Sequence, residues 1–273
     1  MRDIINMEAG IRPSTTIGPN MQSKLAQMLH LDLEPVGIYF ANTVAECDTV
    51  TEPGKRICVV PFLLSAARGK VVGITEEGCG CPGGTVGLCF GDGFTRKNPN
   101  IHRMLSQGLG EQAPEQAPSM MKEGERFFCD EETALRWRNA MPFSDRGFPR
   151  VVFAPESRWG EVGEPDLALV FADADRISAL VTMLGFHNGR AVNTVVPYGA
   201  ACHSIVFAAE QMDSDDPMAV MGLFDISQRS KAIANYLSLT MPRALWKGMQ
   251  EGLDKSCLTT HSWRAIEKRL SGR

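Results

Sequence analysis

The sequence of 273 residues has no apolar run near the length of about 18 residues that a membrane helix requires. It also has no cluster of lysine and arginine, and its formal net charge is −4. The positive surface typical of proteins that bind nucleic acids or anionic membranes is therefore not expected. The first 20 residues contain no continuous apolar segment like that of a signal peptide. We expect a cytoplasmic protein that binds neither nucleic acid nor membranes.

Several chemical signatures are missing as well. The five histidines show no HExxH spacing, and the phosphate-binding pattern G-x-x-x-x-G-K-[ST] does not occur. The eight cysteines form neither the paired C-x₂-C pattern of a zinc site nor the C-x₂-C-x₂-C run of a ferredoxin. Because a reducing cytoplasm disfavours disulfides, these cysteines point to metal binding, redox chemistry or simple burial.

The pattern of apolar residues alternates between helical and strand-like segments. It predicts strands at 36–40, 70–75, 150–154, 167–172, 191–198 and 217–224, and helices at 21–31 (capped by Asn20), 58–69, 98–109, 131–140, 175–186 and 202–210. Residues 110–125 are polar and rich in proline, which indicates a surface excursion, and 226–273 are predicted to be mostly helical. The fold class is therefore α/β or α+β, a mixed sheet with flanking helices in a single domain over 1–273.

The two halves of the chain share one pattern. In each, a strand leads to a cysteine (Cys58 or Cys202) that opens an apolar helix, and a further strand follows. This predicts two pseudo-repeated halves at about 20–90 and 150–225, with the two cysteines in related positions.

The segment GCGCPGG, Gly78 to Gly84, places Cys79 and Cys81 one residue apart among glycines, and Cys89 follows shortly after. Its glycines spell G-x-G-x-x-G behind a predicted strand. A dinucleotide site also needs a helix that begins at this turn, and the glycines and turn residues after Pro82 argue against one. We therefore interpret the fingerprint as accidental. The simplest structural alternative is a tight turn with positive φ at its glycines.

Four segments together resemble a known family: EPVGIYF near the start, the helix opened by Cys58, CPGG followed by VGL (Cys81 to Leu88), and GAACHSIV around Cys202. The resemblance is to the family called domain of unknown function 169, and it extends from about Leu25 to Pro242. The family name implies no activity. It does single out Cys58, Cys81 and Cys202 as the matching cysteines, with Cys79 and Cys89 as features of this chain.

We predict an iron–sulfur cluster, 4Fe-4S ahead of other types, bound by Cys58, Cys81 and Cys202 with Cys79 as the fourth ligand and Cys89 in reserve. All the candidate ligands are sulfur, which suits such clusters, and zinc is the second choice. Backbone N–H groups of a glycine-rich segment can approach the sulfurs and tune the cluster. The expected chemistry is electron transfer, or Lewis-acid handling of a small molecule at an open iron. The partner is then a small molecule or a redox protein.

Three alternatives remain open. In the first, the protein is a metal-free module that binds a small molecule or another protein, and its cysteines are structural. In the second, one of the cysteines is the nucleophile of a thiol-dependent enzyme. Neighbouring helix residues such as Cys202 and His203 do not face each other, so a base would have to come from elsewhere, for example His187. Finally, Trp246, Met249 and Trp263 either form the face of a homodimer or belong to the core.

Overall fold

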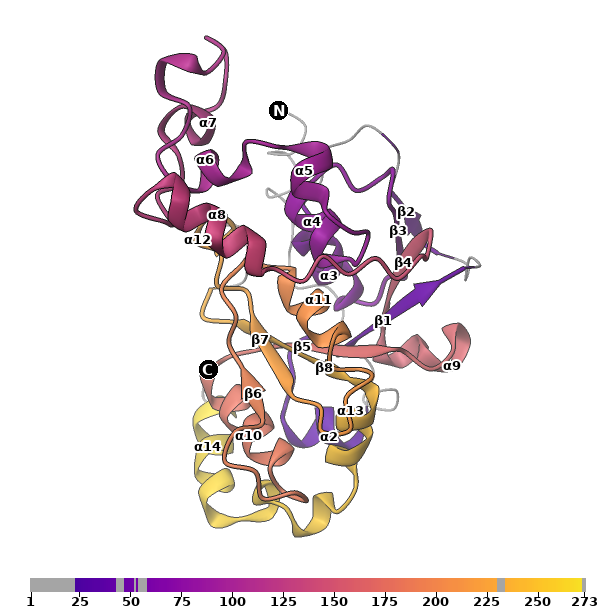
Figure 1. Ribbon diagram of the computed structural model, residues 1–273. Coiled ribbons are helices and arrows are strands. Elements are labelled where there is room, and N and C mark those ends of the chain that lie inside the picture. Colours follow the sequence, from indigo (N-terminus) through magenta and orange to yellow (C-terminus); the bar gives the residue numbers. More distant parts are fainter. Residues whose placement is uncertain (1–22, 43–46, 52, 54–57, 230–233, 272–273) are drawn as a thin grey trace.

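The computed structural model describes residues 23–42, 47–51, 53, 58–229 and 234–271 (Figure 1). The predicted helix at 21–31 and its cap Asn20 begin outside these residues. Within them, helix α2 runs from Lys24 to Met28, and the Ser23 side chain caps it by accepting the N–H of Ala26 at 3.2 Å.

Eight strands form one mixed sheet in the order β2-β3-β4-β1-β5-β8-β7-β6. The β2–β3 and β6–β7 pairs are parallel and all other pairs are antiparallel. The strands are β1 Val36–Ala41, β2 Thr49–Val50, β3 Val72–Thr75, β4 Arg150–Pro155, β5 Leu167–Ala172, β6 Thr194–Val195, β7 Ala219–Gly222 and β8 Leu237–Pro242. This is the α+β architecture predicted from the sequence, a mixed sheet with flanking helices.

The α-helices after α2 follow in chain order, together with four short 3₁₀ turns. The helices are α3 Val60–Ala66, α4 Pro82–Gly87, α5 Gly93–Lys97, α6 Ile101–Leu105, α7 Ser119–Glu123, α8 Glu131–Ala140, α9 Trp159–Val162, α10 Ala174–Leu184, α11 His203–Ala209, α12 Ile226–Arg229, α13 Arg243–Gln250 and α14 His261–Ser271. The 3₁₀ turns are η1 Gly110–Gln112, η2 Glu156–Arg158, η3 Leu253–Lys255 and η4 Cys257–Thr259. Among the described helices, none is long and apolar enough to cross a bilayer.

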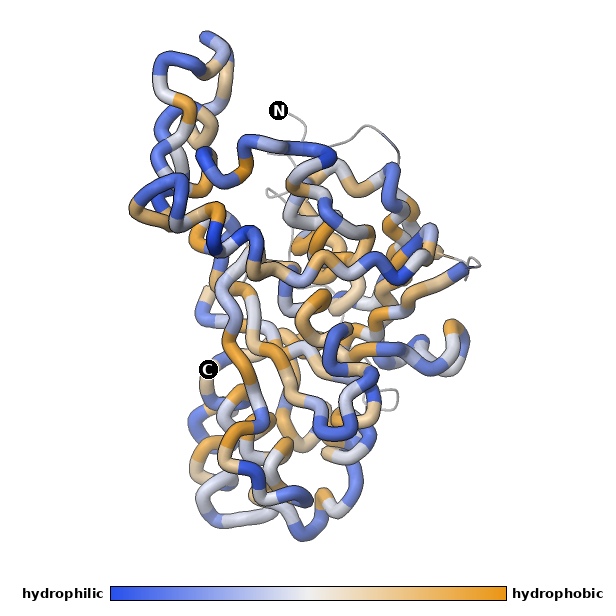
Figure 2. Tube along the Cα trace, viewed as in Figure 1, coloured by the Kyte–Doolittle hydropathy of each residue, from blue (hydrophilic) through white to orange (hydrophobic). Residues whose placement is uncertain are grey.

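The sheet separates two hydrophobic cores. In β5, for example, Leu167, Leu169 and Phe171 face a core shared with α3, α4 and α11. The alternate residues of β5 face a second core shared with α2, α10, α13 and α14. In Figure 1 the helices of the second core gather at the lower end of the view, and Figure 2 shows the hydrophobic residues concentrated along the strands between the two cores.

The second core contains the residues that could have formed a dimer face. Trp246, Met249 and Trp263 are 1%, 2% and 3% exposed and pack in this core. Of the two interpretations offered for them, the structure supports the core, and they provide no surface for a partner.

The strand order is mirrored about the centre of the sheet. From the outer edge inward, the first half reads β2-β3-β4-β1 and the second half β6-β7-β8-β5, so β1 corresponds to β5 and β4 to β8. Helices α3 and α11 occupy matching places before β3 and β7, and both pack on the same face. This order is consistent with two repeated halves, β1 to β4 and β5 to β8, but the repeat and its predicted bounds of 20–90 and 150–225 stay a prediction.

One central strand lies where the sequence predicted helix. β8, Leu237–Pro242, falls within 226–273 and pairs with both β5 and β7. Its apolar and polar residues alternate, and the polar side faces α11, where the Ser204 and Thr240 hydroxyls are 2.9 Å apart. The predicted strands at 191–198 and 217–224 are also shorter in the structure, as β6 and β7.

Candidate functional site

Helix α4 begins inside the segment GCGCPGG, where the sequence predicted no helix. Cys81 is its N-cap residue, and the sulfur of Cys81 accepts the N–H of Gly84 at 3.4 Å. Pro82 occupies the first helical position, where its missing N–H costs nothing. The prediction was wrong because it weighed the low helix propensity of glycine above this start signal.

Tertiary packing explains why the segment is rich in glycine. None of Gly78, Gly83, Gly84 and Gly87 has a positive φ, so the predicted turn with positive φ is wrong. The reason is close approach instead. A Cβ atom on Gly84 would lie 2.9 Å from the sulfur of Cys79. The backbone of α4 therefore packs directly against a thiol, which only glycine allows.

The presence of α4 does not make the G-x-G-x-x-G pattern a dinucleotide-binding site. A dinucleotide-binding unit joins two parallel strands through its helix. Here β3 precedes α4, and the next strand along the chain, β4, pairs antiparallel with β3. The helix is also only six residues long. These features support the interpretation that the fingerprint is accidental.

The loop before α4 is held by α5. The ammonium group of Lys97 donates hydrogen bonds to the carbonyl oxygens of Glu76 and Cys79. α5 is itself capped by Asp92, whose carboxylate accepts the N–H of Thr95 at 3.0 Å. The loop that carries Cys79 and Cys81 is thus tied at both ends, by β3 and by α5.

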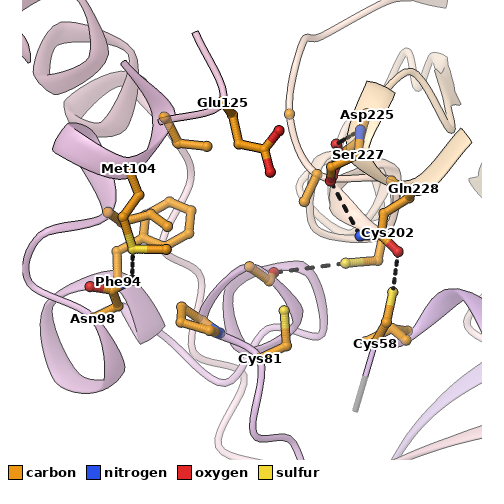
Figure 3. A pocket seen from close by; sticks show the side chains of 18 of the residues that line it. Cys58, Cys81, Phe94, Asn98, Met104, Glu125, Cys202, Asp225, Ser227 and Gln228 are labelled. Carbon is orange, nitrogen blue, oxygen red and sulfur yellow. Dashed lines mark hydrogen bonds between the residues drawn. The ribbon is translucent and has the colours of Figure 1, made fainter. Parts of the chain in front are cut away.

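A cavity of about 310 Å³ opens beside α4 (Figure 3). Cys58, Cys81 and Cys202 all line it, although they come from three separate segments of the chain. Cys58 directly precedes the first turn of α3, Cys81 caps α4, and Cys202 caps α11. Figure 3 shows the three thiols on one side of the cavity. The structure therefore brings together the three cysteines that the family resemblance singled out.

Each of the three thiols has a polar neighbour. Cys58 donates to the Gln228 side chain at 3.2 Å, and Cys202 donates to the carbonyl of Gly83 at 3.8 Å. Burial raises the pKa of Cys202 well above its ordinary value, and the nearby thiols of Cys81, Cys58 and Cys79 raise it further. In the metal-free protein Cys202 is a neutral thiol at pH 7.

The other two candidate ligands do not line the cavity. Cys79 is 2% exposed in the core beside α4, where the Thr85 hydroxyl lies 3.9 Å from its sulfur. Burial raises its pKa as well. Cys89 follows the C-terminal end of α4, whereas Cys81 stands at its start. The backbone of Cys89 is in the left-handed conformation, with φ 60°. Burial raises the pKa of Cys89 to about 12.

Neither candidate histidine is a free base. The Nδ1 atom of His203 accepts the N–H of Ala200 at 3.0 Å, so Nε2 carries the proton and donates to the carbonyl of Gly83 at 3.1 Å. Burial lowers the pKa of His203 to about 4, which keeps the ring neutral. His187 lies 2.9 Å from the carbonyl of Glu251 through Nε2, away from the cavity. Neither histidine is therefore placed to act as a general base for Cys202.

The excursion forms part of the cavity wall, which the sequence did not predict. Its tip is exposed and projects to one side at the top of Figure 1. At its base, however, Met120, Glu125 and Phe127 line the cavity. Tyr198 and Asp225 complete this wall. The prediction of a surface segment therefore holds for the tip, but it did not anticipate that the base lines the cavity.

The described residues contain no group of three or more histidine, cysteine, aspartate or glutamate side chains placed to hold a single metal ion. Thiolates that share one zinc ion, with bonds of about 2.3 Å, lie about 3.8 Å apart. Among the described residues, the thiols of the cavity are therefore not placed as the shared ligands of one ion. Three thiols at the starts of helices are a donor set of the kind that iron–sulfur clusters use.

A family model described as DUF169, uncharacterised ArCR, COG2043, matches residues 24–252. This match covers most of the chain, and the protein belongs to that family. No curated protein and no solved structure gives a significant match.

Proposed function

We propose that the protein binds an iron–sulfur cluster, of the 4Fe-4S type, through Cys58, Cys81 and Cys202. The observation that carries this proposal is that the three thiols line one side of one cavity. They come from distant parts of the chain, and each stands at the start of a helix that packs on the same face of the sheet. Structural cysteines scattered through a core have no reason to converge on open space.

The packing of α4 supports the proposal further. The helix touches Cys79 and Cys202 with glycine positions, and its first turn donates a backbone N–H to the sulfur of Cys81. Hydrogen bonds of this kind to ligating sulfurs stabilise clusters and set their reduction potential. The described residues form no group that could hold a single ion, which favours a cluster over zinc because a cluster distributes its protein ligands over several irons.

Three cysteine ligands leave one iron without a protein thiolate. Cys79 was the predicted fourth ligand, but it does not line the cavity, so we propose that the fourth position faces the cavity and takes an external ligand. When bound, the cluster would supply electron transfer or Lewis-acid activation there. The chain's own contribution is a mostly apolar chamber, with Phe94, Ile101 and Met104 on the side away from the thiols, which limits the access of water.

The cavity also favours a second candidate, a metal-free module that binds a small molecule, with the cysteines as packing residues. Its volume of about 310 Å³ lies at the lower end of the range for ligand pockets. The thiol-dependent enzyme has less support, because Cys202 is buried with a raised pKa and neither candidate histidine can act as its base. A buried thiol of this kind is a poor nucleophile.

One preparation separates these candidates. Iron, zinc and acid-labile sulfide are measured per chain on protein purified without oxygen, and an absorption spectrum is recorded from the same sample. The proposal predicts about four irons and four sulfides with broad visible absorption. One zinc without sulfide, or a colourless protein with neither metal nor sulfide after reconstitution, would overturn it.

The same assay on Cys79→Ser decides the fourth ligand. Retention of the full iron and sulfide content supports an external ligand on the cavity side. Loss of the cluster would make Cys79 a ligand, as the sequence predicted.

A further inference from the structure

The lining of the cavity carries two carboxylates. Glu125, at the base of the excursion, and Asp225, just before α12, both line the cavity. Figure 3 shows the carboxylate of Glu125 directed into the open space, across from Cys58, Cys81 and Cys202. No hydrogen bond or ion pair joins the Glu125 carboxylate to another described residue. It is therefore available to a ligand.

The Asp225 carboxylate is held by hydrogen bonds, whereas Glu125 is held only through its backbone. One oxygen of Asp225 accepts the N–H and the hydroxyl of Ser227, at 3.0 and 2.7 Å. Glu125 is positioned by its backbone, whose N–H donates to the carbonyl of Met104 at 2.7 Å. A second backbone bond of 2.9 Å, from Phe127 to Leu105, closes the base of the excursion. The backbone bonds thus fix where the Glu125 side chain starts, and the hydrogen bonds from Ser227 fix the Asp225 carboxylate.

The charge inside the cavity is negative. Lys97 is the only cationic side chain among the described residues that line it, and its ammonium group is bound to the carbonyls of Glu76 and Cys79. Burial raises the pKa of Glu125, and the neighbouring charge of Asp225 raises it further. A positive charge placed between the two carboxylates would relieve both effects.

The remainder of the lining is apolar. Phe94, Ile101, Met104, Leu105 and Phe127 surround the space next to the carboxylates. A ligand that fits therefore combines an apolar body of modest size with one cationic group.

We propose that the cavity binds a small primary amine or a similar organic cation, whose protonated nitrogen lies between Glu125 and Asp225 and whose apolar body packs against Phe94 and Phe127. This inference deepens the proposed function by naming the class of ligand that the same cavity binds. Binding of the amine does not require the cluster; only its later activation by the cluster rests on the proposed function. The ion pair with the carboxylates gives selectivity for a protonated nitrogen. Contact with Phe127, two residues after Glu125 at the base of the excursion, gives selectivity for an apolar body.

The test compares two probes of nearly equal shape, benzylamine and benzyl alcohol, by titration calorimetry of the full chain. We expect benzylamine to bind at least about tenfold more tightly, the difference that one charged hydrogen bond supplies. Glu125→Gln should remove this preference while benzyl alcohol still binds, which shows that the cavity is intact. Glu123→Gln is the matched control, because Glu123 is exposed two residues away, does not line the cavity, and loses the same charge.

Equal binding of the two probes, binding of neither, or an equal loss of preference in Glu123→Gln and Glu125→Gln would overturn the inference. The titrations are made on protein as isolated and on metal-free protein. A preference for the amine in a protein that holds no iron would leave the inference standing while the cluster proposal fails. A cluster-containing protein without the preference would leave the cluster proposal standing while the inference fails.

Discussion

A Cβ atom added to Gly87 would lie 2.8 Å from the sulfur of Cys202 and 3.0 Å from its carbonyl oxygen. Non-bonded atoms do not pack at such distances, so α4 and the start of α11 fit together only because position 87 has no side chain. Gly84 has the same relationship to Cys79. The glycines of this segment therefore allow a helix to lie against two thiols, which is the contact that builds one wall of the cavity.

Replacing Gly87 tests this packing. We predict that Gly87→Ala destabilises the protein by about 1–3 kcal/mol, the usual cost of adding a group to a filled core. Gly248→Ala is the control, because Gly248 also lies in a helix, α13, and a Cβ there would meet nothing within 4 Å. It should raise stability by up to about 1 kcal/mol, since alanine favours helix. Urea unfolding measures both, and equal midpoints for the two variants would refute the packing account.

Alkylation of the metal-free protein tests whether any buried cysteine is a reactive nucleophile. Cys129 is exposed, whereas Cys79, Cys89 and Cys202 are buried and burial raises the pKa of each. Because the thiolate is the reactive form, iodoacetamide at pH 8 should modify Cys129 first and reach the three buried thiols only on unfolding. Peptide mass spectrometry over time gives the order. Rapid modification of Cys202 in the folded protein would favour the thiol-dependent enzyme instead.

We predict that the stability of the protein depends on pH through the carboxyl group of Glu156. Glu156 follows the end of β4, and its Oε2 accepts the N–H of Ser23 at 3.0 Å. Burial raises the pKa of Glu156, and Glu34 nearby raises it further. The folded state thus binds the proton more tightly than the unfolded chain. The resulting contribution to stability is full below the unfolded-state pKa and is lost as the pH rises through the folded-state pKa.

Glu156→Gln removes the charge and keeps an acceptor for Ser23. We predict a higher urea midpoint than wild type at pH 7 and an equal midpoint at pH 4. Glu123→Gln, which changes an exposed carboxylate, should leave both midpoints nearly unaltered. A midpoint for Glu156→Gln below that of wild type at pH 7 would mean that the ionised carboxylate stabilises the fold.

Local patterns predicted much of the sheet. The continuous apolar run Leu167–Ala172 matches β5 residue for residue, because a strand buried on both faces needs no polar positions. β8 was missed although Leu237, Leu239 and Met241 alternate with polar residues, since its polar face is buried against α11 and the neighbouring segments read as helix. Its place between β5 and β7 depends on pairing over long distances in the chain, which no local pattern contains.

The site was predictable in part. The cysteines at helix starts and the glycine-rich segment were visible in the sequence. Three of the four ligands predicted from the sequence line the cavity. Two features were not. α4 forms despite its glycines because packing against Cys202 outweighs propensity. The contribution of Glu125 follows from how the excursion folds back, a relationship between Met104 and Glu125 through backbone bonds that composition does not reveal.

The ligand assignment is tested most directly by the iron and sulfide content of four serine variants prepared side by side. Cys58→Ser, Cys81→Ser and Cys202→Ser each remove one thiol of the cavity, and Cys129→Ser removes an exposed thiol outside it. The account predicts that Cys129→Ser keeps the wild-type content of about four irons and four sulfides, while each of the other three loses most of both. Wild-type content in all four variants would contradict the assignment of these cysteines, and a wild-type protein without iron or sulfide would contradict the cluster itself.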